Sequence, residues 1–383
     1  MAGARDVTSG STDGGTPPGT LSRTRVTPVS NDVMRATLAA RVRRNGGHGG
    51  GVLRVESPTQ GVLFEATSGE LAHGERAMRA ADAFEIASIT KTFTAALVLL
   101  LVEDGKLGLE TAIGELLPRE ITERLLVLDG VDYGPRLTIR QLLSHRSGLP
   151  DYWTDPPKVA RTSDNAFMTE FLRDADRMWE PDAIVPFIKK LRPIGPPGSQ
   201  YHYCDSGYLL LGSIVERLAR ASLHTVLRAR VLGPLALRET YFSYREEAPP
   251  GLSVSHRYEA KLDLHGQRRQ SADWASGGLV STSADLGRFI LSLAGGKLFR
   301  QPTTFEVMKT WQPTGKRDVD YGLGLFRVRL AGDLGELWGH DGHGNAFAYY
   351  WPSEQISWVG TLNQTKNDWW ELVEVGAKAL VTE

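Results

Sequence analysis

The sequence predicts an α/β (α+β) fold: an antiparallel sheet flanked by helices, built from both chain ends, with an all-helical domain inserted in the middle. Three observations support this prediction. Strand-like segments occur towards both ends of the 383-residue chain, helical segments alternate with Pro- and Gly-rich loops between them, and one helix, from about Ser88 to Glu103, is apolar nearly all round. A helix without a polar face belongs at the centre of a fold, where other elements cover every side.

These patterns divide the chain into three parts. Residues 1–28 are rich in Gly, Ser, Thr and Pro and are expected to form a disordered tail. Residues 29–106 and 270–383 together are expected to form the sheet domain, and residues 107–269 the helical domain.

The elements follow in order along the chain. Asn31 to Arg44 has helical periodicity, and the segments Val52 to Glu56 and Val62 to Thr67 are typical of two short strands joined by a turn. The apolar helix comes next, and Asp104-Gly105 ends it. The clearest helices of the middle region span Leu137 to Ser144, Ala183 to Lys190 and Tyr208 to Ala219.

The last part of the chain begins with a helix from Asp285 to Leu293 and closes with a helix from Trp369 to Leu380. Between them, turns separate four segments that are typical of successive antiparallel strands. These strands span Leu323 to Leu330, Leu334 to His340, Ala346 to Trp351 and Ile356 to Leu362.

Composition excludes several classes of function. Lys and Arg number 44 and Asp and Glu 45, a formal net charge of −1, so nothing indicates a nucleic-acid or membrane partner. The longest apolar run, Ala95 to Val102, is far shorter than the roughly 20 residues of a membrane helix. Cys204 is the only cysteine, which excludes an intramolecular disulfide and a multi-thiolate metal site. Because no signal-peptide core is evident, we expect a cytoplasmic protein. We also expect no cofactor and no metal.

The first candidate for catalysis is Ser88-Ile89-Thr90-Lys91. Residues three apart share a helix face, so the amine of Lys91 can reach the hydroxyl of Ser88. A serine is a weak nucleophile until a nearby base takes its proton, and burial disfavours the charged form of a lysine, which makes a buried lysine a candidate base. The alternative is a capping serine followed by a surface lysine, but a lysine in an all-apolar helix has no evident solvated face.

The second candidate is Tyr203-Cys204-Asp205, in a loop that runs into a helix and can therefore project side chains into a cleft. A tyrosine beside an ammonium can act as a general base, because the ammonium stabilises its phenolate. The alternative is that Tyr203, like Tyr201 and Tyr208, is a core aromatic. We interpret Cys204 as a small filler residue and not as a nucleophile.

The third candidate is the segment Trp338 to Gly344 at the end of a predicted strand. Its His and Asp residues resemble metal ligands, but no third ligand stands nearby at a suitable spacing. Its glycines indicate that the backbone approaches another group closely.

Taken in order, these motifs resemble the serine β-lactamase and penicillin-binding-protein-like superfamily, most closely its class C-type branch of esterases, D-aminopeptidases and D-Ala-D-Ala carboxypeptidases. The resemblance covers nearly the whole chain from about Asn31 onward. Supporting stretches are Leu137 to Pro150, Gly277 to Thr282 with Asp285-Leu286, and Tyr321 to Gly324.

The resemblance implies an active site between the sheet domain and the helical domain. Ser88 would be the acylated nucleophile, Lys91 and Tyr203 would exchange its proton, and the backbone N–H groups of Ser88 and His343 would form the oxyanion hole. The substrate would be a small-molecule ester, amide or short peptide, with no cofactor.

The sequence departs from the family pattern at the second motif. The family usually has Asn where this chain has Asp205, and a carboxylate cannot donate a hydrogen bond to a substrate carbonyl. We expect Asp205 either to hold Lys91 charged, which leaves Tyr203 as the base, or to bind a substrate ammonium.

The sequence also departs from the pattern at the third motif. β-Lactamases carry Lys-Thr-Gly where this chain has His340-Asp341-Gly342. We expect His340 and Gly342 to contact the substrate, with the histidine as a weak, pH-dependent anchor for a carboxylate, and we therefore expect poor β-lactam hydrolysis.

Serine-dependent hydrolysis of an ester or amide is the leading prediction. Two alternatives stay open: transfer of the same acyl group to an amine or alcohol acceptor, as in natural-product biosynthesis, and a catalytically silent binding protein. Four tryptophans near the predicted cleft are expected to be core residues and not the lining of an acyl pocket. They are Trp153, Trp179, Trp274 and Trp338.

Overall fold

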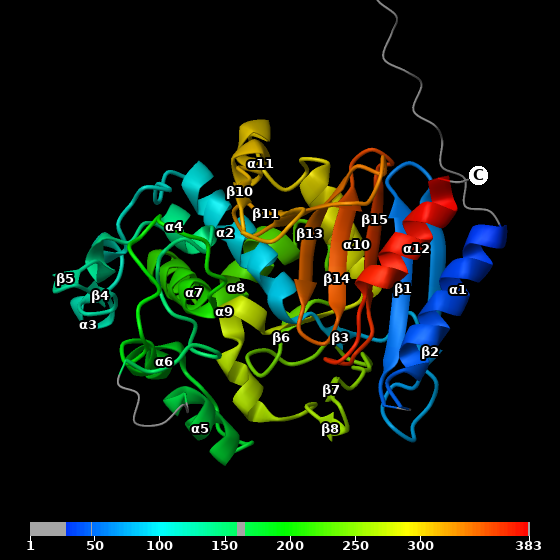
Figure 1. Ribbon diagram of the computed structural model, residues 1–383, viewed down its shortest axis with the longest axis horizontal. Coiled ribbons are helices and arrows are strands. Elements are labelled where there is room, and N and C mark those ends of the chain that lie inside the picture. Colours follow the sequence, from blue (N-terminus) through cyan, green and yellow to red (C-terminus); the bar gives the residue numbers. More distant parts are fainter. Residues whose placement is uncertain (1–27, 47, 159–164, 382–383) are drawn as a thin grey trace, which may run out of the picture.

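The structure, a computed structural model, describes residues 28–46, 48–158 and 165–381 (Figure 1). The predicted disordered tail at 1–28 lies outside these ranges, except for Pro28. Within the described residues, the fold confirms the predicted class: a large antiparallel sheet with helices on both faces, and a mostly helical region beside it.

The main sheet has eight strands in the order β10-β11-β12-β13-β14-β15-β1-β2, and neighbouring strands are antiparallel. The pairing of β1 with β15 joins the two ends of the chain, as predicted. The strands are β1 Gly50–Ser57, β2 Gly61–Gly69, β10 Gln312–Pro313, β11 Val319–Tyr321, β12 Phe326–Arg329, β13 Glu336–Gly342, β14 Ala346–Trp351 and β15 Ile356–Thr361.

Both faces of the sheet are covered. Helices α1 (Pro28–Arg43) and α12 (Trp370–Val381) pack together on one face, and α10 (Ser283–Ala294) packs on the other (Figure 1). Side chains alternate between the faces of a strand, and in β14 the large residues Phe347 and Tyr349 point towards α1 and α12, whereas Ala346 and Ala348 point towards the opposite core. Small side chains on that second face let α10 pack closely against the sheet.

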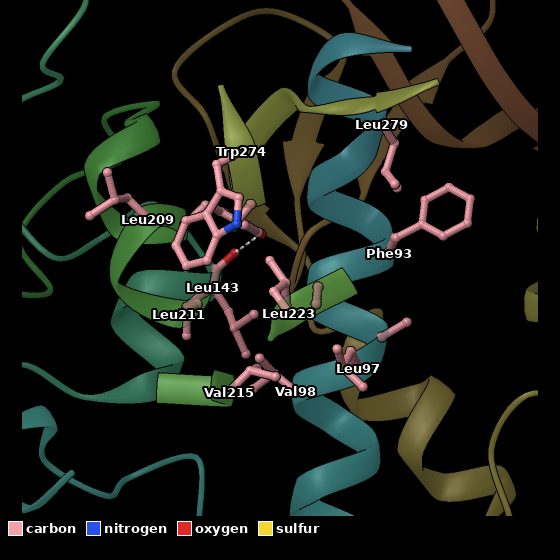
Figure 2. Packing of buried hydrophobic residues seen from close by; sticks show 14 of the residues in the cluster. Phe93, Leu97, Val98, Leu143, Leu209, Leu211, Val215, Leu223, Trp274 and Leu279 are labelled. Atoms are coloured by element: carbon pink, nitrogen blue, oxygen red, sulfur yellow. Dashed lines mark hydrogen bonds between the residues drawn. The ribbon is translucent and has the colours of Figure 1, made fainter. Parts of the chain in front are cut away.

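The central helix is α2 (Thr90–Glu103), which is buried from its first residue to Leu101. Figure 2 shows Phe93, Leu97 and Val98 of α2 packed among apolar side chains of the surrounding elements. Each large side chain buried in this way stabilises the fold by about 1.5–3 kcal/mol. The surrounding elements are α4 Ile139–Leu143, α7 Asp205–Ala219, α8 Leu223–Leu227, α9 Trp274–Gly277 and β9 Leu279–Ser281.

The Tyr321 to Gly324 stretch fixes α2 in place. Thr92 Oγ1 donates a 2.8 Å hydrogen bond to the carbonyl of Gly324. Gly324 has a positive φ of +79°, and a Cβ there would lie 2.3 Å from the Cβ of Ala95, so only glycine fits against the helix. This motif therefore has a packing role.

The region from 107 to 269 is mostly helical, but it also contains strands of two residues each, so the prediction of an all-helical insertion needs this correction. Two residues are too few to show a periodic pattern. Four of these strands form two local hairpins, at 127–132 and 258–263, and Tyr241–Phe242 pairs with the distant strand β9. The predicted boundaries at 107 and 269 stay a prediction. The remaining elements are η2 Ile113–Glu115, α3 Arg119–Thr122, β4 Val127–Leu128, β5 Val131–Asp132, η3 Gly134–Arg136, α5 Ala166–Arg173, α6 Pro181–Ile188, η4 Arg228–Leu232, β6 Tyr241–Phe242, β7 Tyr258–Glu259, β8 Leu262–Asp263 and η5 Arg268–Ala272 in this region, and β3 Phe84–Glu85, η1 Ala87–Ile89 and α11 Pro302–Met308 outside it.

Among the described helices, none combines the length and the apolar character needed to cross a membrane. The cytoplasmic location stays a prediction.

Candidate active site

Ser88 lies in a short 3-10 turn, η1, directly before α2. The turn follows β3, which pairs with β9, and the N–H of Ile86 donates a 3.0 Å hydrogen bond to the carbonyl of Leu279. Ala87 has a φ of 45°, in the left-handed region that disfavours residues with a Cβ. The chain is thus held in a strained conformation at the residue before Ser88, and the Gly277 to Thr282 stretch holds it there.

Gly342 closes the turn from the other side. A Cβ at this position would lie 2.3 Å from the carbonyl oxygen of Ile86, so β13 can approach the turn only because it ends in glycine. The close approach that its sequence indicates is therefore to the backbone before Ser88. The structure gives Gly342 a positioning contact, and its expected contact with substrate stays a prediction.

The hydroxyl of Ser88 meets the amine of Lys91 and the phenol of Tyr203. Lys91 Nζ donates a 3.0 Å hydrogen bond to Ser88 Oγ, and it lies 4.8 Å from the centre of the Tyr203 ring. The Ser88 side chain also acts to lower the pKa of Tyr203, which reflects how close the two side chains lie. Ser88 and Tyr203 are half-buried, whereas Lys91 is fully buried, so a small substrate can reach the hydroxyl but not the amine.

Two further groups surround the Lys91 amine. Nζ lies 2.7 Å from Asp205 Oδ1 and donates a 2.9 Å hydrogen bond to the carbonyl of Ser276. Together with Ser88 Oγ, these partners receive the three N–H bonds of an ammonium group. The geometry therefore matches a charged Lys91 at rest, because a buried ammonium needs a counter-ion and a full set of acceptors.

Sequence reasoning missed the residues that hold Asp205. Ser276 Oγ donates to Asp205 Oδ2 over 3.2 Å, and the backbone N–H of Asp205 donates to Asp151 Oδ1 over 2.9 Å. Burial and the charge of Asp205 raise the pKa of Asp151 to about 7. Both residues adjoin motifs that were noted in the sequence, but only the fold brings them to the site.

Tyr203 is a neutral phenol at rest. Burial and then the charge of Asp205 raise its pKa well above the usual value, and the interaction with Ser88 opposes this effect. Its ring lies 4.3 Å from that of His145, whose Nδ1 accepts a 3.0 Å hydrogen bond from the N–H of Cys204. Burial lowers the pKa of His145, so this histidine is neutral and supports the Tyr203 loop.

The two backbone N–H groups expected in the oxyanion hole lie on segments that approach each other at Gly342. Within η1, the backbone N–H groups of Ile89 and Thr90 donate the hydrogen bonds of the turn. The N–H of Ser88 is not one of these donors. His343 follows β13 directly. The geometry thus places both segments beside Ser88, and the role of the two N–H groups stays a prediction.

Arg257, which is 4% exposed, links these two segments. Its Nε donates a 2.7 Å hydrogen bond to Glu85 Oε2 on β3, and its Nη1 lies 3.1 Å from His343 Nδ1, which accepts. A Cβ on Gly344 would lie 2.6 Å from Arg257 Cδ, so the turn after His343 rests against the guanidinium stem. No motif in the sequence pointed to this residue.

His340 is fully buried beside Tyr203. Its Nδ1 donates to the carbonyl of Asp341 over 2.6 Å, and its Nε2 accepts from the hydroxyl of Tyr321 over 3.3 Å. Burial and the charge of Lys91 lower the pKa of His340 to about 3. Contrary to the expectation of a pH-dependent anchor, His340 therefore carries no charge for a substrate carboxylate at neutral pH.

The remaining candidates lie in the core or at its edge. Cys204 is 1% exposed, its Sγ donates to the carbonyl of Pro150, and burial raises its pKa, which agrees with a filler role. Trp179 and Trp274 are buried, and Trp153 and Trp338 are half-buried.

The arrangement has the parts of nucleophilic acyl transfer. A reachable hydroxyl contacts two groups that can exchange protons, and a strained turn presents the hydroxyl at the head of a buried helix. A backbone N–H at such a helix start favours developing negative charge.

Comparisons with known proteins agree with this geometry. A family model described as Beta-lactamase matches residues 35–379. Penicillin-binding protein 4 from Amycolatopsis lactamdurans is 28% identical over 316 residues, which cover 76% of this chain and 74% of that protein.

Solved structures are also similar over most of the chain. A D-stereospecific amidohydrolase from Streptomyces sp. has a TM-score of 0.74 at 26% identity, covering 90% of this chain and 98% of that one. The D-amino acid amidase from Ochrobactrum anthropi SV3 complexed with L-phenylalanine amide has a TM-score of 0.75 at 25% identity, covering 92% and 99%. The similarity thus includes both the sheet and the helices that surround Ser88.

Proposed function

The chain belongs to the beta-lactamase family, and from this premise we propose that it is a serine hydrolase that forms an acyl-enzyme on Ser88 with small esters or amides. One observation carries the proposal: the amine of a fully buried lysine lies 3.0 Å from the hydroxyl of a half-buried serine. A catalytically silent protein has no use for this buried charge, which costs stability unless every partner is present.

In the acylation step, Ser88 Oγ bonds to the substrate carbonyl carbon, and the carbonyl oxygen takes the negative charge. The N–H groups of Ser88 and His343 receive this oxyanion. The proton of Ser88 passes to the Lys91–Tyr203 pair, which returns it to the leaving amine or alcohol as the carbon–nitrogen or carbon–oxygen bond breaks. The hydrogen bond from Lys91 to Ser88, and the position of the Tyr203 ring 4.8 Å from the Lys91 amine, support this route.

In the deacylation step, water attacks the acyl-enzyme, gives its proton to the same pair, and Ser88 is released with its proton restored. The pair must be one proton short before it can accept the proton of Ser88. Asp205 stabilises the fully protonated pair, so we propose that activity rises towards alkaline pH.

The substrate class follows from the charges near Ser88. His340 is neutral and both of its ring nitrogens are bonded within the chain, so a substrate carboxylate finds no cation there. We therefore propose uncharged or cationic acyl donors and poor β-lactam hydrolysis. Because the similar solved structures include a D-stereospecific amidohydrolase and a D-amino acid amidase, amides of D-amino acids are the first class to test.

The test compares the wild type with Ser88→Ala and with Ser199→Ala, which changes an exposed serine outside the site. Short-chain aryl esters and D-amino-acid amides are the substrates, and a serine-reactive phosphonate followed by peptide mass spectrometry locates the nucleophile. We expect turnover and an adduct on Ser88 in the wild type and in Ser199→Ala, and neither in Ser88→Ala. An adduct on another residue, or no turnover of any substrate, would contradict the proposal. Adding an amine to the assay distinguishes hydrolysis from acyl transfer by the products.

A further inference from the structure

An ion pair between His202 and Asp155 lies beside the catalytic residues and has no part in the proposed chemistry. His202 Nε2 donates a 2.6 Å hydrogen bond to Asp155 Oδ2, and the two side chains are 29% and 13% exposed. His202 directly precedes Tyr203 in the chain, and Asp155 lies in the segment that follows α4. The pair therefore ties the loop that carries Tyr203 to a neighbouring segment.

The same carboxylate is also connected to the counter-ion of Lys91. Asp155 Oδ2 accepts a second hydrogen bond, of 2.6 Å, from the N–H of Asp151. The side chain of Asp151 in turn accepts the N–H of Asp205 over 2.9 Å, and Asp205 is paired with Lys91. A continuous series of bonds thus runs from His202 to the group that holds the Lys91 amine.

His145 holds the Tyr203 loop from the other side. The N–H of His202 donates a 2.8 Å hydrogen bond to the carbonyl of His145, and the N–H of Cys204 donates a 3.0 Å hydrogen bond to its Nδ1. These bonds join neutral groups. A hydrogen bond between ionised partners is about twice as strong, so a charged His202 makes its contact with Asp155 the strongest of the three.

The strength of the pair depends on the charge of His202. The hydrogen bond with Asp155 raises the pKa of His202, burial opposes this effect, and the charges of Asp155 and Asp151 add to it. The other titratable group that faces His202 in the described structure is His145, which is neutral. Because the pKa is higher in the folded chain, the full contribution of the pair is present below about pH 6.5 and is lost as the pH rises through the raised pKa.

We propose that His202 and Asp155 are positioning residues, whose ion pair sets the phenol of Tyr203 against Ser88 and, through Asp151, the carboxylate of Asp205 against Lys91. The inference rests on the proposed function, because it assigns the pair to the same acyl transfer. A small displacement of a proton-transfer group lowers the rate strongly. Loss of the charge on His202 therefore reduces kcat without removing a reacting group.

The kinetic experiment compares the wild type with His202→Gln between about pH 6 and 10, with one aryl ester as substrate. Glutamine can still donate a hydrogen bond to Asp155, but it never carries a charge. The ratio of the two kcat values cancels the titration of the Lys91–Tyr203 pair, which both proteins share. We expect this ratio to be about tenfold at the acidic end and to approach one at the alkaline end, with KM values within about twofold. The midpoint of the change should coincide with the titration of the His202 ring measured by NMR.

Two further variants separate charge from fold. His202→Arg keeps a cation at every pH in this range, so it should recover part of the kcat lost in His202→Gln and show no decline through the titration of His202. Asp155→Asn keeps the shape of the side chain but removes its charge, and should lower kcat at the acidic end about as much as His202→Gln does.

A second measurement does not depend on turnover. Hydrogen exchange at a single acidic pH, followed by mass spectrometry, reports on peptides that cover Tyr201 to Asp205, whose amides bond to His145 and Asp151. We expect exchange in this segment to be about threefold faster or more in His202→Gln and in Asp155→Asn than in the wild type, with little change in peptides of the sheet.

The chain offers a matched control in a second short ion pair, His256 with Asp263 at 2.7 Å in the hairpin of β7 and β8. Asp263→Asn removes the charge from that pair and should leave both measurements as in the wild type. A kcat ratio that does not change with pH, or unchanged exchange of the Tyr203 loop in both variants, would overturn the inference. If the wild type turns over no substrate, the exchange measurement still decides whether the pair holds the loop, so this failure and that of the proposed function are distinguishable.

Discussion

Replacing Asp205 by Asn should shift the acidic limb of the pH–rate profile to lower pH. Asn has nearly the same shape and keeps an oxygen near Lys91, but it removes the negative charge that lies 2.7 Å from Nζ. Without that charge, the Lys91–Tyr203 pair loses a proton more readily, whichever of the two residues releases it. The variant therefore reaches its active protonation state at a lower pH than the wild type.

The structure sets the size of the shift. Two unit charges at 2.7 Å in an effective dielectric of about 20 interact by roughly 6 kcal/mol, which is an upper bound because the Asn dipole and nearby solvent replace part of it. A close opposite charge in proteins typically shifts protonation by about 1–3 pH units. We expect the acidic limb of kcat/KM to move by this amount.

The assay measures kcat/KM for one aryl ester between about pH 4 and 10, the range in which carboxylates, histidines and tyrosines titrate. Aryl esters suit it because their leaving group needs little protonation, so the profile reports the base. Asp333→Asn controls for net charge and should leave the limb in place. An unmoved limb in Asp205→Asn, or a shift to higher pH, would refute the reasoning that Asp205 stabilises the protonated pair.

Three other predictions follow from the same geometry. Gly342→Ala places a Cβ 2.3 Å from the carbonyl oxygen of Ile86, so kcat should fall about a hundredfold, whereas the free energy of unfolding should fall by only about 1–3 kcal/mol. A variant that loses this much stability but keeps the wild-type kcat would contradict the prediction. The pKa of His340 is lowered to about 3 in the folded chain, so as the pH falls below about 6.5 the unfolded state takes up a proton first, and stability is lost from there towards pH 3. The free energy of unfolding in urea, measured at pH 7 and at pH 5, should therefore fall by about 2 kcal/mol less in His340→Gln than in the wild type. Arg257→Met removes the contact with His343, so kcat should fall on the order of tenfold with little change in KM, and Arg257→Lys should recover part of it; an effect on KM alone would argue against a positioning role.

The sequence predicted the parts of the fold that long patterns determine. The apolar run in α2 and the four C-terminal strands were correct to within a few residues. In α2, β14 and β15, burial on all sides leaves a nearly continuous apolar pattern, and turns mark the limits of the other two strands. The strands β10 and β6 were not predicted. Each has two residues, and their pairing depends on partners elsewhere in the chain.

At the site, the sequence could place Ser88 and Lys91 together because both lie within one helical turn of each other. Tyr203 joined them only through the family resemblance. Arg257 carried no signal, because what distinguishes it is its pairing with partners from distant segments, Glu85 and His343. That property exists only in the folded chain.

The pairing of β1 with β15 has a consequence for how the protein folds. Ser357 on β15 bonds to Glu56 on β1 across 301 positions of sequence. During synthesis, the β1–β2 hairpin exposes an unpaired edge and its apolar side chains until β15 has left the ribosome, and contacts this distant in sequence slow folding. Chaperones, which shield exposed strand edges, or a lower expression temperature should therefore increase the yield of native protein. Neither should increase the stability of protein that has already folded to the same extent.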